Sequence, residues 1–503
     1  MSQVLIPGLA PTRRRAWWEP YGSFPAGLEA RIQEIRDLYV ENQVPFVIGF
    51  SGGKDSMLVV LLTWLAVAGL APEQRHKPVF ICSTDTGVEN PVVVRWVDGH
   101  LAAIRQAAVR QEMPVEVHRL RPVTEDTYWF SLIGRGYAAP RALFRWCTER
   151  LKIRPNTRFI REVVSQHGET ILLLGTRKAE SAARAKVMKR HEKGRTRERL
   201  SPNGDLPNSM VYTPVEDFEN DDVWMALMQL SELPWGRSAK ELLALYQGAS
   251  PDAECPLVMD STTPSCGSSR FGCWTCTVVE QDRSMTSMIT NEPDEYAWMR
   301  PLLALRNDLA DMGLDRGRRE FTRWDGRLTV HKDRLVHGLY TQEARADWLR
   351  KVLETQEKIR RRAPAEYAGL ELISTDELVA IRRQWVTGHH EIEDLAPGIY
   401  EEATGRPWPG TETFDSMLHV QRVDLEVLRE VAGSDREYRM LRDLLDVEQR
   451  FTVAGRRTRR VDEVEKVLHR YVFDSEDEAL EFALQHEPVG PEGRQMPLFT
   501  GLE

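Results

Sequence analysis

The sequence predicts an α/β fold, in which a parallel sheet is followed by a cysteine-rich segment and a mostly helical C-terminal region. Between about residues 44 and 230, short apolar runs of strand length alternate with longer helical patterns. This alternation is typical of a parallel sheet with helices on both faces. Four of the six cysteines then fall within residues 255–276, and from about 291 onward the chain is charged and mostly helical in pattern.

The elements of the predicted sheet can be delimited in order. The strands are expected at 44–50, 78–85, 115–120 and 170–176, and the clearest helices at 56–69, 90–111 and 152–167. Ligands of parallel sheets bind at the carboxyl ends of the strands. The residues that follow each strand are therefore the first candidates for a site.

Composition divides the 503 residues into four expected regions. They are a leader with one helix at 1–43, the sheet domain at 44–230, the cysteine-rich segment at 231–290 and the helical region at 291–503. The tail from about 487 is rich in Gly and Pro, and we expect it to be flexible.

The formal net charge is −9, so no global field draws the chain toward nucleic acid or an anionic membrane. Between Arg177 and Arg199, however, ten Lys or Arg stand against three Glu. Such a run is most often a solvated face or loop, and the alternative is a surface that contacts phosphates. No apolar run reaches the roughly 18 residues that span a bilayer, and the N-terminus lacks the order of a secretory signal, so we expect a cytoplasmic protein.

Residues 51–56, SGGKDS, lie between a strand-like run and a helical pattern. Two glycines let backbone N–H groups close on an anion, the start of the next helix adds its positive end, and a lysine and two hydroxyls complete the cradle. The loop is not a Walker A motif, which needs Gly at position 48 and Ser or Thr after the lysine. A plain glycine turn is the alternative. The candidate binding residues are Ser51, Gly52, Gly53, Lys54, Asp55 and Ser56.

The stretch FSGGKDS resembles the PP-loop of N-type ATP pyrophosphatases, which cleave ATP between the α and β phosphates, adenylate a substrate and release pyrophosphate. Three further stretches resemble motifs of the branch that includes phosphoadenylylsulfate (PAPS) reductases. They are STDTGVENP at 83–91, GTRKAESAARA at 175–185 and TPVEDFENDDVW at 213–224. The resemblance covers about 44–230 and implies an adenine nucleotide α-hydrolase-like fold that binds ATP with Mg²⁺.

These motifs suggest roles for individual residues. Gly87 permits close backbone approach at a strand end, the guanidinium of Arg177 can neutralise charge that develops on a phosphate, and Glu180 can orient it. For the charged residues of the second motif, a surface ion-pair set is the alternative. The further candidates for nucleotide binding are Asp85, Thr86, Gly87, Gly175, Arg177, Glu180, Ser181 and Arg184.

The clustered cysteines are candidate metal ligands. Structural zinc usually takes two C-x-x-C pairs, and only Cys273 and Cys276 form one, so the uneven spacing favours a [4Fe–4S] cluster over zinc. Unliganded thiols are the third possibility. The expected ligands are Cys255, Cys266, Cys273 and Cys276.

Cys147 stands apart from the cluster, in the stretch RWCTERLKIRP. Its basic neighbours are Arg145, Arg150, Lys152 and Arg154. Nearby cations depress a thiol pKa, which suits a nucleophile or a persulfide carrier. The alternatives are a buried structural cysteine and a fourth cluster ligand in place of Cys255. Cys82, in an apolar strand, is expected in the core.

The complete set of motifs resembles the DndC proteins, the PP-loop component of bacterial DNA phosphorothioation. PAPS reductases that work with thioredoxin carry a catalytic cysteine near the C-terminus, and APS reductases carry an adjacent Cys-Cys pair; here no cysteine follows Cys276 and no such pair occurs. The resemblance implies a [4Fe–4S] cluster, DNA as substrate, a cysteine desulfurase as sulfur donor, and DndD- and DndE-like partners.

The implied reaction begins with attack of a DNA phosphate on the α-phosphate of ATP, which releases pyrophosphate. Sulfur then replaces a non-bridging oxygen, and Lys54, Cys147 and Arg177 are the expected catalytic residues. Three other classes of function stay open: a sulfonucleotide reductase of the PAPS or APS type, a PP-loop tRNA thiolase, and a nucleotide-dependent assembly switch without catalysis.

Overall fold

The computed structural model divides the chain into two compact units. It describes residues 28–180, 185–186, 188–189, 199–204, 206–250, 271–411, 422–454 and 460–486. Unit 1 comprises residues up to Tyr128, Ala139–Ala310 and Val352–Ile373. Unit 2 comprises Trp129–Ala138, Asp311–Lys351 and the residues from Ser374 onward. The domain boundaries predicted at 43, 230 and 290 stay predictions.

Unit 1 contains a six-stranded sheet in the order β3-β2-β1-β4-β6-β5. The strands are β1 (Phe46–Gly49), β2 (Val79–Thr84), β3 (Val115–Leu120), β4 (Thr170–Leu173), β5 (Ser201–Pro202) and β6 (Ser209–Tyr212). All neighbours pair in parallel except β5, which runs antiparallel to β6 at the edge. The predicted parallel sheet and its four predicted strands are confirmed, whereas the short strands β5 and β6 were not predicted.

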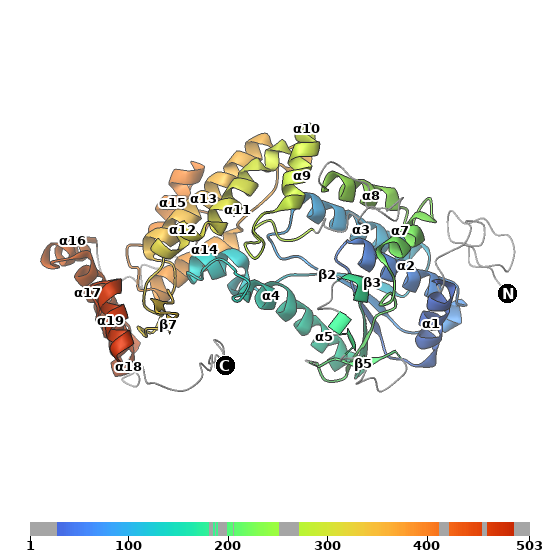
Figure 1. The fold of residues 1–503 in the computed structure, drawn as a ribbon, viewed down its shortest axis with the longest axis horizontal. Coiled ribbons are helices and arrows are strands. Elements are labelled where there is room, and N and C mark those ends of the chain that lie inside the picture. The colour runs from blue at the N-terminus through green and yellow to red at the C-terminus, as the bar shows by residue number, and fades with distance from the viewer. Residues whose placement is uncertain are drawn as a thin grey trace. The chain divides into compact units, whose positions relative to one another are not determined.

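Helices cover this sheet on both faces. The helices of unit 1 are α1 (Leu28–Glu41), α2 (Lys54–Ala68), α3 (Pro91–Arg110), α4 (Trp146–Thr148), α5 (Arg154–His167), α7 (Asn220–Met228), α8 (Ala239–Gly248), α9 (Arg283–Asn291), α10 (Pro293–Tyr296) and α11 (Arg300–Ala310). A π-helical turn, Glu149–Ile153, joins α4 and α5 into one helical stretch (Figure 1).

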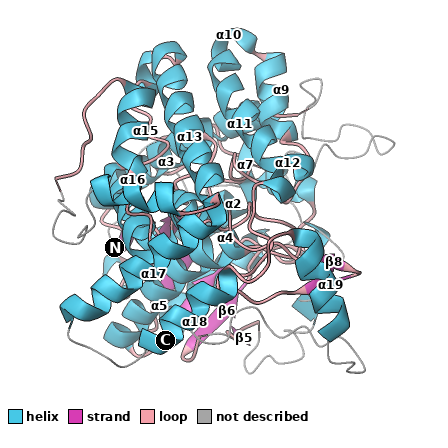
Figure 2. Ribbon diagram, turned by 90° about the vertical axis from the view of Figure 1, so that its left-hand side faces the viewer, coloured by secondary structure: helices cyan, strands magenta, loops and turns pink. Residues whose placement is uncertain are grey.

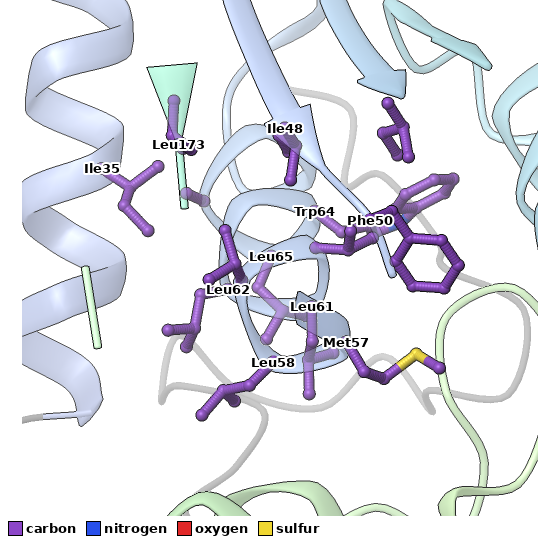
Figure 3. Packing of buried hydrophobic residues seen from close by; sticks show 14 of the residues in the cluster. Ile35, Ile48, Phe50, Met57, Leu58, Leu61, Leu62, Trp64, Leu65 and Leu173 are labelled. Carbon is purple, nitrogen blue, oxygen red and sulfur yellow. The ribbon is translucent and has the colours of Figure 1, made fainter. Parts of the chain in front are cut away.

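The larger core lies on the face of the sheet that carries Phe46 and Ile48, where α1, α2, α3 and α7 pack. Figure 3 shows the apolar side chains of α2 beside Ile35 of α1 and Ile48 of β1. Every residue from Ser56 to Ala68 is buried, so α2 is enclosed on all sides rather than amphipathic. Because α2 is held in this way, the loop that precedes it has a fixed position.

The opposite face of the sheet carries the alternate side chains of the same strands, as the period of two requires. Val47, Phe80 and Cys82 pack there against Phe159 and Val163 of α5. Cys82 is therefore a core residue, as predicted, and its burial raises the pKa of its thiol.

Unit 2 is mostly helical, which confirms the predicted character of the C-terminal region (Figure 2). Its elements are α12 (Met312–Gly317), α14 (Thr375–Arg383), α15 (Leu395–Thr404), α16 (Arg422–Val431), α17 (Asp435–Ala454), α18 (Arg460–Arg470), α19 (Glu476–His486) and the hairpin of β7 (Val330–His331) and β8 (Arg334–Leu335). The helix α13 (Gln342–Arg362) contributes to both units. Buried charges are paired: Arg345 and Glu391, each with a side chain 4% exposed, form an ion pair.

Among the described helices, none combines the length and the apolar character that crossing a bilayer requires. The predicted flexible tail lies outside the described residues.

Replacing Leu62 by Ala tests the role of α2. Its side chain is fully buried in the larger core, so Leu62→Ala should lower the free energy of unfolding of unit 1 by about 2–5 kcal/mol. Denaturant titration followed by circular dichroism measures this change. Val109→Ala is the control, because Val109 is 78% exposed on α3. Equal midpoints for the two variants would contradict the packing described here.

Candidate functional site

The phosphate loop connects β1 to α2 through residues 50–53. Ser56 Oγ donates to the carbonyl of Gly53 at 3.0 Å and lies 3.1 Å from Ser51 Oγ, so the two hydroxyls close the loop on itself. No side chain caps the start of α2, where Gly53 is the N-cap. The loop is therefore pre-shaped beside a helix N-terminus, the arrangement that favours anions.

Gly52 is required by this shape. Its φ is +76°, and a Cβ at this position would lie 2.4 Å from Val97 Cγ2. The indole Nε1 of Trp96 donates to the carbonyl of Gly52 at 3.0 Å, which fixes the same peptide from the side of α3. The glycine at position 52 is therefore explained by its positive φ and by the lack of room for a side chain beside Val97.

Gly175, after β4, forms the second wall of the site. A Cβ at Gly175 would lie 2.8 Å from the backbone carbon of Asp55 and 2.9 Å from the backbone nitrogen of Ser56. Backbone atoms in a packed helix start cannot move aside, so only glycine permits this close approach. The resemblance had suggested Gly175, and the structure supplies the reason.

Arg177 follows on the same loop and is only 3% exposed. Its Nε donates to Asp55 Oδ1 at 2.6 Å, and its Nη1 donates to the carbonyl of Phe218 at 3.0 Å. Glu180 accepts a hydrogen bond from the backbone N–H of Arg177 at 3.2 Å. Asp55, a residue of the phosphate loop, therefore orients the guanidinium, the role that the sequence had suggested for Glu180.

Lys54 faces the same carboxylate from the other side. Its Nζ lies 3.3 Å from Asp55 Oδ2 and 5.6 Å from the centre of the Tyr246 ring. Burial lowers the pKa of Lys54, Asp55 opposes that effect, and Arg177 adds to it. A buried arginine and a mostly buried lysine share one carboxylate, so the site favours a further anion.

The pocket beside these groups has a volume of about 750 Å³ and lies within unit 1. Its apolar side is formed by Val93, Trp96, Leu245, Tyr246 and Phe271. Burial, followed by the Asp55 carboxylate, raises the pKa of Tyr246 to about 12. The sequence did not single out Trp96 or Tyr246, because an aromatic residue in a helical pattern carries no local sign that it borders a site.

The segment Asp85–Gly87 does not line this pocket. Asp85 Oδ1 accepts from the backbone N–H of Gly87 at 3.0 Å, and Oδ2 accepts from Arg121 Nε at 3.1 Å. Thr86 Oγ1 lies 3.5 Å from Cys273 Sγ. The segment thus lies at the thiols, and Glu89, two residues beyond it, reaches the pocket wall instead.

Three cysteines come together in unit 1. Cys273 forms a backbone bridge with Glu89, and the N–H of Cys276 donates to the carbonyl of Cys273 at 3.0 Å, which closes a tight turn. Burial raises the pKa of Cys273 to about 11, against the opposing effect of Lys152. Cys147, on α4, interacts electrostatically with both other thiols.

The pKa of the Cys147 thiol differs from the sequence-based prediction. Burial raises the pKa of the Cys147 thiol, and Cys276 raises it further, so the predicted lowering by neighbouring cations is wrong. The reason is that two of those cations are neutralised elsewhere. Arg150 pairs with Asp126, and Arg154 Nη1 lies 2.8 Å from the same carboxylate.

The predicted ligand set is covered only in part. Cys255, Cys266, Ser181 and Arg184 lie outside the described residues. Within the part of the chain that is described, no group of three or more His, Cys, Asp or Glu side chains is arranged to hold a metal ion.

The pocket and the cysteines adjoin at one part of the pocket wall. Glu89, Lys152 and Gly272 line the pocket, and each is also a neighbour of Cys273: Glu89 through the backbone bridge, Lys152 through its charge and Gly272 through the chain. The described thiols are not themselves among the lining residues; they adjoin the pocket through these three neighbours of Cys273.

The fold and the site define an α/β domain with a glycine-rich loop between its central strand β1 and the helix α2. Residues 45–279 match the model of the phosphoadenosine phosphosulfate reductase domain. An uncharacterized protein of Methanocaldococcus jannaschii is 25% identical over 195 residues, which cover 39% of this chain and 34% of that protein. The chain thus matches about a third of the length of this relative.

Solved structures are similar at lower levels. PAPS reductase from Candida auris is 13% identical with a TM-score of 0.25, over 39% of this chain and 77% of that one. FMN adenylyltransferase from Candida glabrata is 10% identical with a TM-score of 0.28, over 46% and 68%. The U34-tRNA thiolase NcsA from Methanococcus maripaludis, solved with its [4Fe–4S] cluster, is 15% identical with a TM-score of 0.27, over 57% and 80%.

Gly175→Ala tests the close approach at the phosphate loop. The new methyl group would press on the backbone of Asp55, so we expect a loss of about 1–3 kcal/mol in stability and a loss of pyrophosphate binding. Isothermal titration calorimetry with pyrophosphate, together with thermal unfolding, measures both. Gly272→Ala is the matched control, since Gly272 lines the same pocket and a Cβ there meets nothing within 4 Å. Equal behaviour of the two variants would refute the steric argument.

Proposed function

We propose that this protein is a DNA phosphorothioation sulfurtransferase, which uses ATP to adenylate a DNA backbone phosphate and then replaces a non-bridging oxygen with sulfur. The observation that carries the proposal is the position of Cys273, whose neighbours Glu89, Lys152 and Gly272 line the same pocket as the phosphate loop. A reaction that needs both an activated phosphate and a sulfur atom requires this proximity.

The phosphate loop would hold the β and γ phosphates of ATP. Lys54 and Arg177 are the cations of this half of the site, and both are already fixed by Asp55. Groups that are held in place before the reaction stabilise developing charge without reorganising. Attack by a DNA phosphate oxygen on the α-phosphorus breaks the α–β bond, and pyrophosphate leaves in the cradle.

Mg²⁺ would accompany ATP, and the chain offers oxygen ligands for it. Glu219 and Asp221 line the pocket, and Asp221 Oδ1 is buried without a hydrogen-bond partner within the described part of the chain. A buried carboxylate oxygen in this state fits a hard cation, which takes oxygen ligands. We therefore assign Mg²⁺ to these carboxylates.

Cysteine thiols are the type of ligand that holds iron–sulfur clusters in proteins. Cys273 and Cys276 would hold a [4Fe–4S] cluster with Cys255 and Cys266. Cys147 is close enough to Cys273 and Cys276 to interact with both thiols. When bound, the cluster would supply a soft site for sulfur next to the pocket.

Cys147 would carry the sulfur as a persulfide delivered by a cysteine desulfurase. Its terminal sulfur attacks the adenylated DNA phosphorus, and AMP leaves with the former DNA oxygen. A thiol of an external reductant then attacks the Cys147 sulfur, so the S–S bond breaks and the phosphorothioate is released. A second reductant thiol reduces the resulting mixed disulfide, which restores the Cys147 thiol and oxidises the reductant to its disulfide. DndD- and DndE-like proteins would present the DNA.

Lys54→Ala tests the ATP half of the proposal. We expect DNA-dependent release of pyrophosphate to fall by about a hundredfold or more, because a fixed positive charge at the departing pyrophosphate is removed. A coupled pyrophosphate assay measures the rate. Lys240→Ala, which removes an exposed lysine of α8, should leave the rate unchanged. If Lys54→Ala releases pyrophosphate at the wild-type rate, the loop does not hold the phosphates of ATP.

Cys147→Ser separates the two half-reactions. We expect pyrophosphate release to persist, while phosphorothioate-linked dinucleotides disappear from nuclease-digested host DNA examined by mass spectrometry. If the digested DNA of cells with the intact protein contains no sulfur and their tRNA contains a thionucleoside that depends on the protein, the DNA proposal is wrong and tRNA thiolation takes its place.

A further inference from the structure

Tyr246 brings a hydroxyl group to the phosphate loop from the helix α8 and lines the pocket there. A Cβ built on Gly53, the N-cap of α2, would lie 3.3 Å from the Tyr246 hydroxyl oxygen. The backbone N–H of Lys54, the first residue of α2, interacts with the same hydroxyl. The hydroxyl therefore lies at the end of α2 that favours an anion.

Two aromatic neighbours hold the ring of Tyr246 in place. Its centre lies 5.3 Å from that of Trp224, at an interplanar angle of 86°, and 5.1 Å from that of Phe271, at 87°. Trp224 is itself fully buried in the larger core. Edge-to-face contacts of this kind favour one orientation of the ring, so packing alone directs the hydroxyl toward the loop.

The hydroxyl has a hydrogen-bond donor to spare. Burial, followed by the Asp55 carboxylate, raises the pKa of Tyr246 to about 12, so the hydroxyl keeps its proton at neutral pH. In the part of the chain that the structure describes, no residue accepts a hydrogen bond from Tyr246. Because a phenol has one O–H donor, this donor is available to a ligand in the pocket.

Lys54 and Tyr246 flank the loop together. Lys54 Nζ lies 5.6 Å from the centre of the Tyr246 ring, a distance at which a ring face attracts an ammonium group. Both groups border the start of α2, so one bound phosphate group can meet the ammonium and the hydroxyl. A neutral donor is suited to this position, because Asp55 and Glu180 already supply negative charge beside it.

We propose that the Tyr246 hydroxyl donates a hydrogen bond to a phosphate oxygen of the ligand that the loop holds. The inference rests on the proposed function, in which this loop holds the β and γ phosphates of ATP, and it adds a binding residue from α8. A pocket aromatic can instead contact the adenine base, and that role is an outcome of the test.

The test uses Tyr246→Phe in the full chain. This change removes the hydroxyl and keeps the ring that packs on Trp224 and Phe271 and faces Lys54. Tyr296→Phe is the matched control, since Tyr296 ends α10 in the same unit and does not line the pocket. Calorimetry measures binding of pyrophosphate and of adenosine, which has the base but no phosphate, and circular dichroism measures thermal unfolding.

We expect Tyr246→Phe to bind pyrophosphate about ten- to a hundredfold more weakly, because a hydrogen bond to a charged group is lost. Its affinity for adenosine and its unfolding temperature should not change, since the hydroxyl donates to no described residue. Tyr296→Phe should match the wild-type protein in all three measurements.

Equal pyrophosphate affinities for Tyr246→Phe and the wild-type protein would overturn the inference and leave the loop assignment standing. A loss of adenosine affinity as large as the loss for pyrophosphate would also overturn it, because the hydroxyl would then serve the base. If the wild-type protein binds no pyrophosphate, the loop does not hold phosphates, and the proposed function fails together with this inference.

Discussion

The site depends on the ion pair between Arg177 and Asp55. It joins the loop after β4 to the loop after β1, with Nε and Oδ1 2.6 Å apart. Buried ion pairs contribute little net stability, because desolvation offsets the attraction between the charges. The geometry of this pair therefore points to function: Asp55 keeps two cations, Arg177 and Lys54, in place at the mouth of a pocket that has room for a polyanion.

Everything around the pair serves to hold it. The helix α2 is buried on all sides, so Asp55, in its first turn, cannot shift. Gly175 lets the loop after β4 approach the backbone of Asp55, and the carbonyl of Phe218 accepts the remaining end of the guanidinium. A nucleotide would meet a site whose charged groups are already oriented, which is the condition for electrostatic catalysis.

The parts of this architecture that depend on local pattern could be predicted from the sequence. Strands β1 to β4 are apolar runs bounded by turns, and the phosphate loop follows from two glycines and a lysine between a strand and a helix. Residues brought in by tertiary contacts could not be predicted. Tyr246 enters the pocket from α8, beyond the expected end of the nucleotide domain, and Asp126 neutralises arginines near Cys147 from a separate segment of the chain. Counting cations along the sequence therefore gave the wrong direction for the pKa of the Cys147 thiol.

The central claim is that a DNA phosphate oxygen becomes part of AMP. It is tested most directly with DNA whose non-bridging phosphate oxygens carry oxygen-18, incubated with ATP, the sulfur donor and the partner proteins. We predict that AMP recovered from the reaction contains the heavy isotope in its phosphate, with one labelled oxygen for each phosphorothioate formed. Unlabelled AMP alongside sulfurated DNA would show that the DNA phosphate is not adenylated, and would contradict the account.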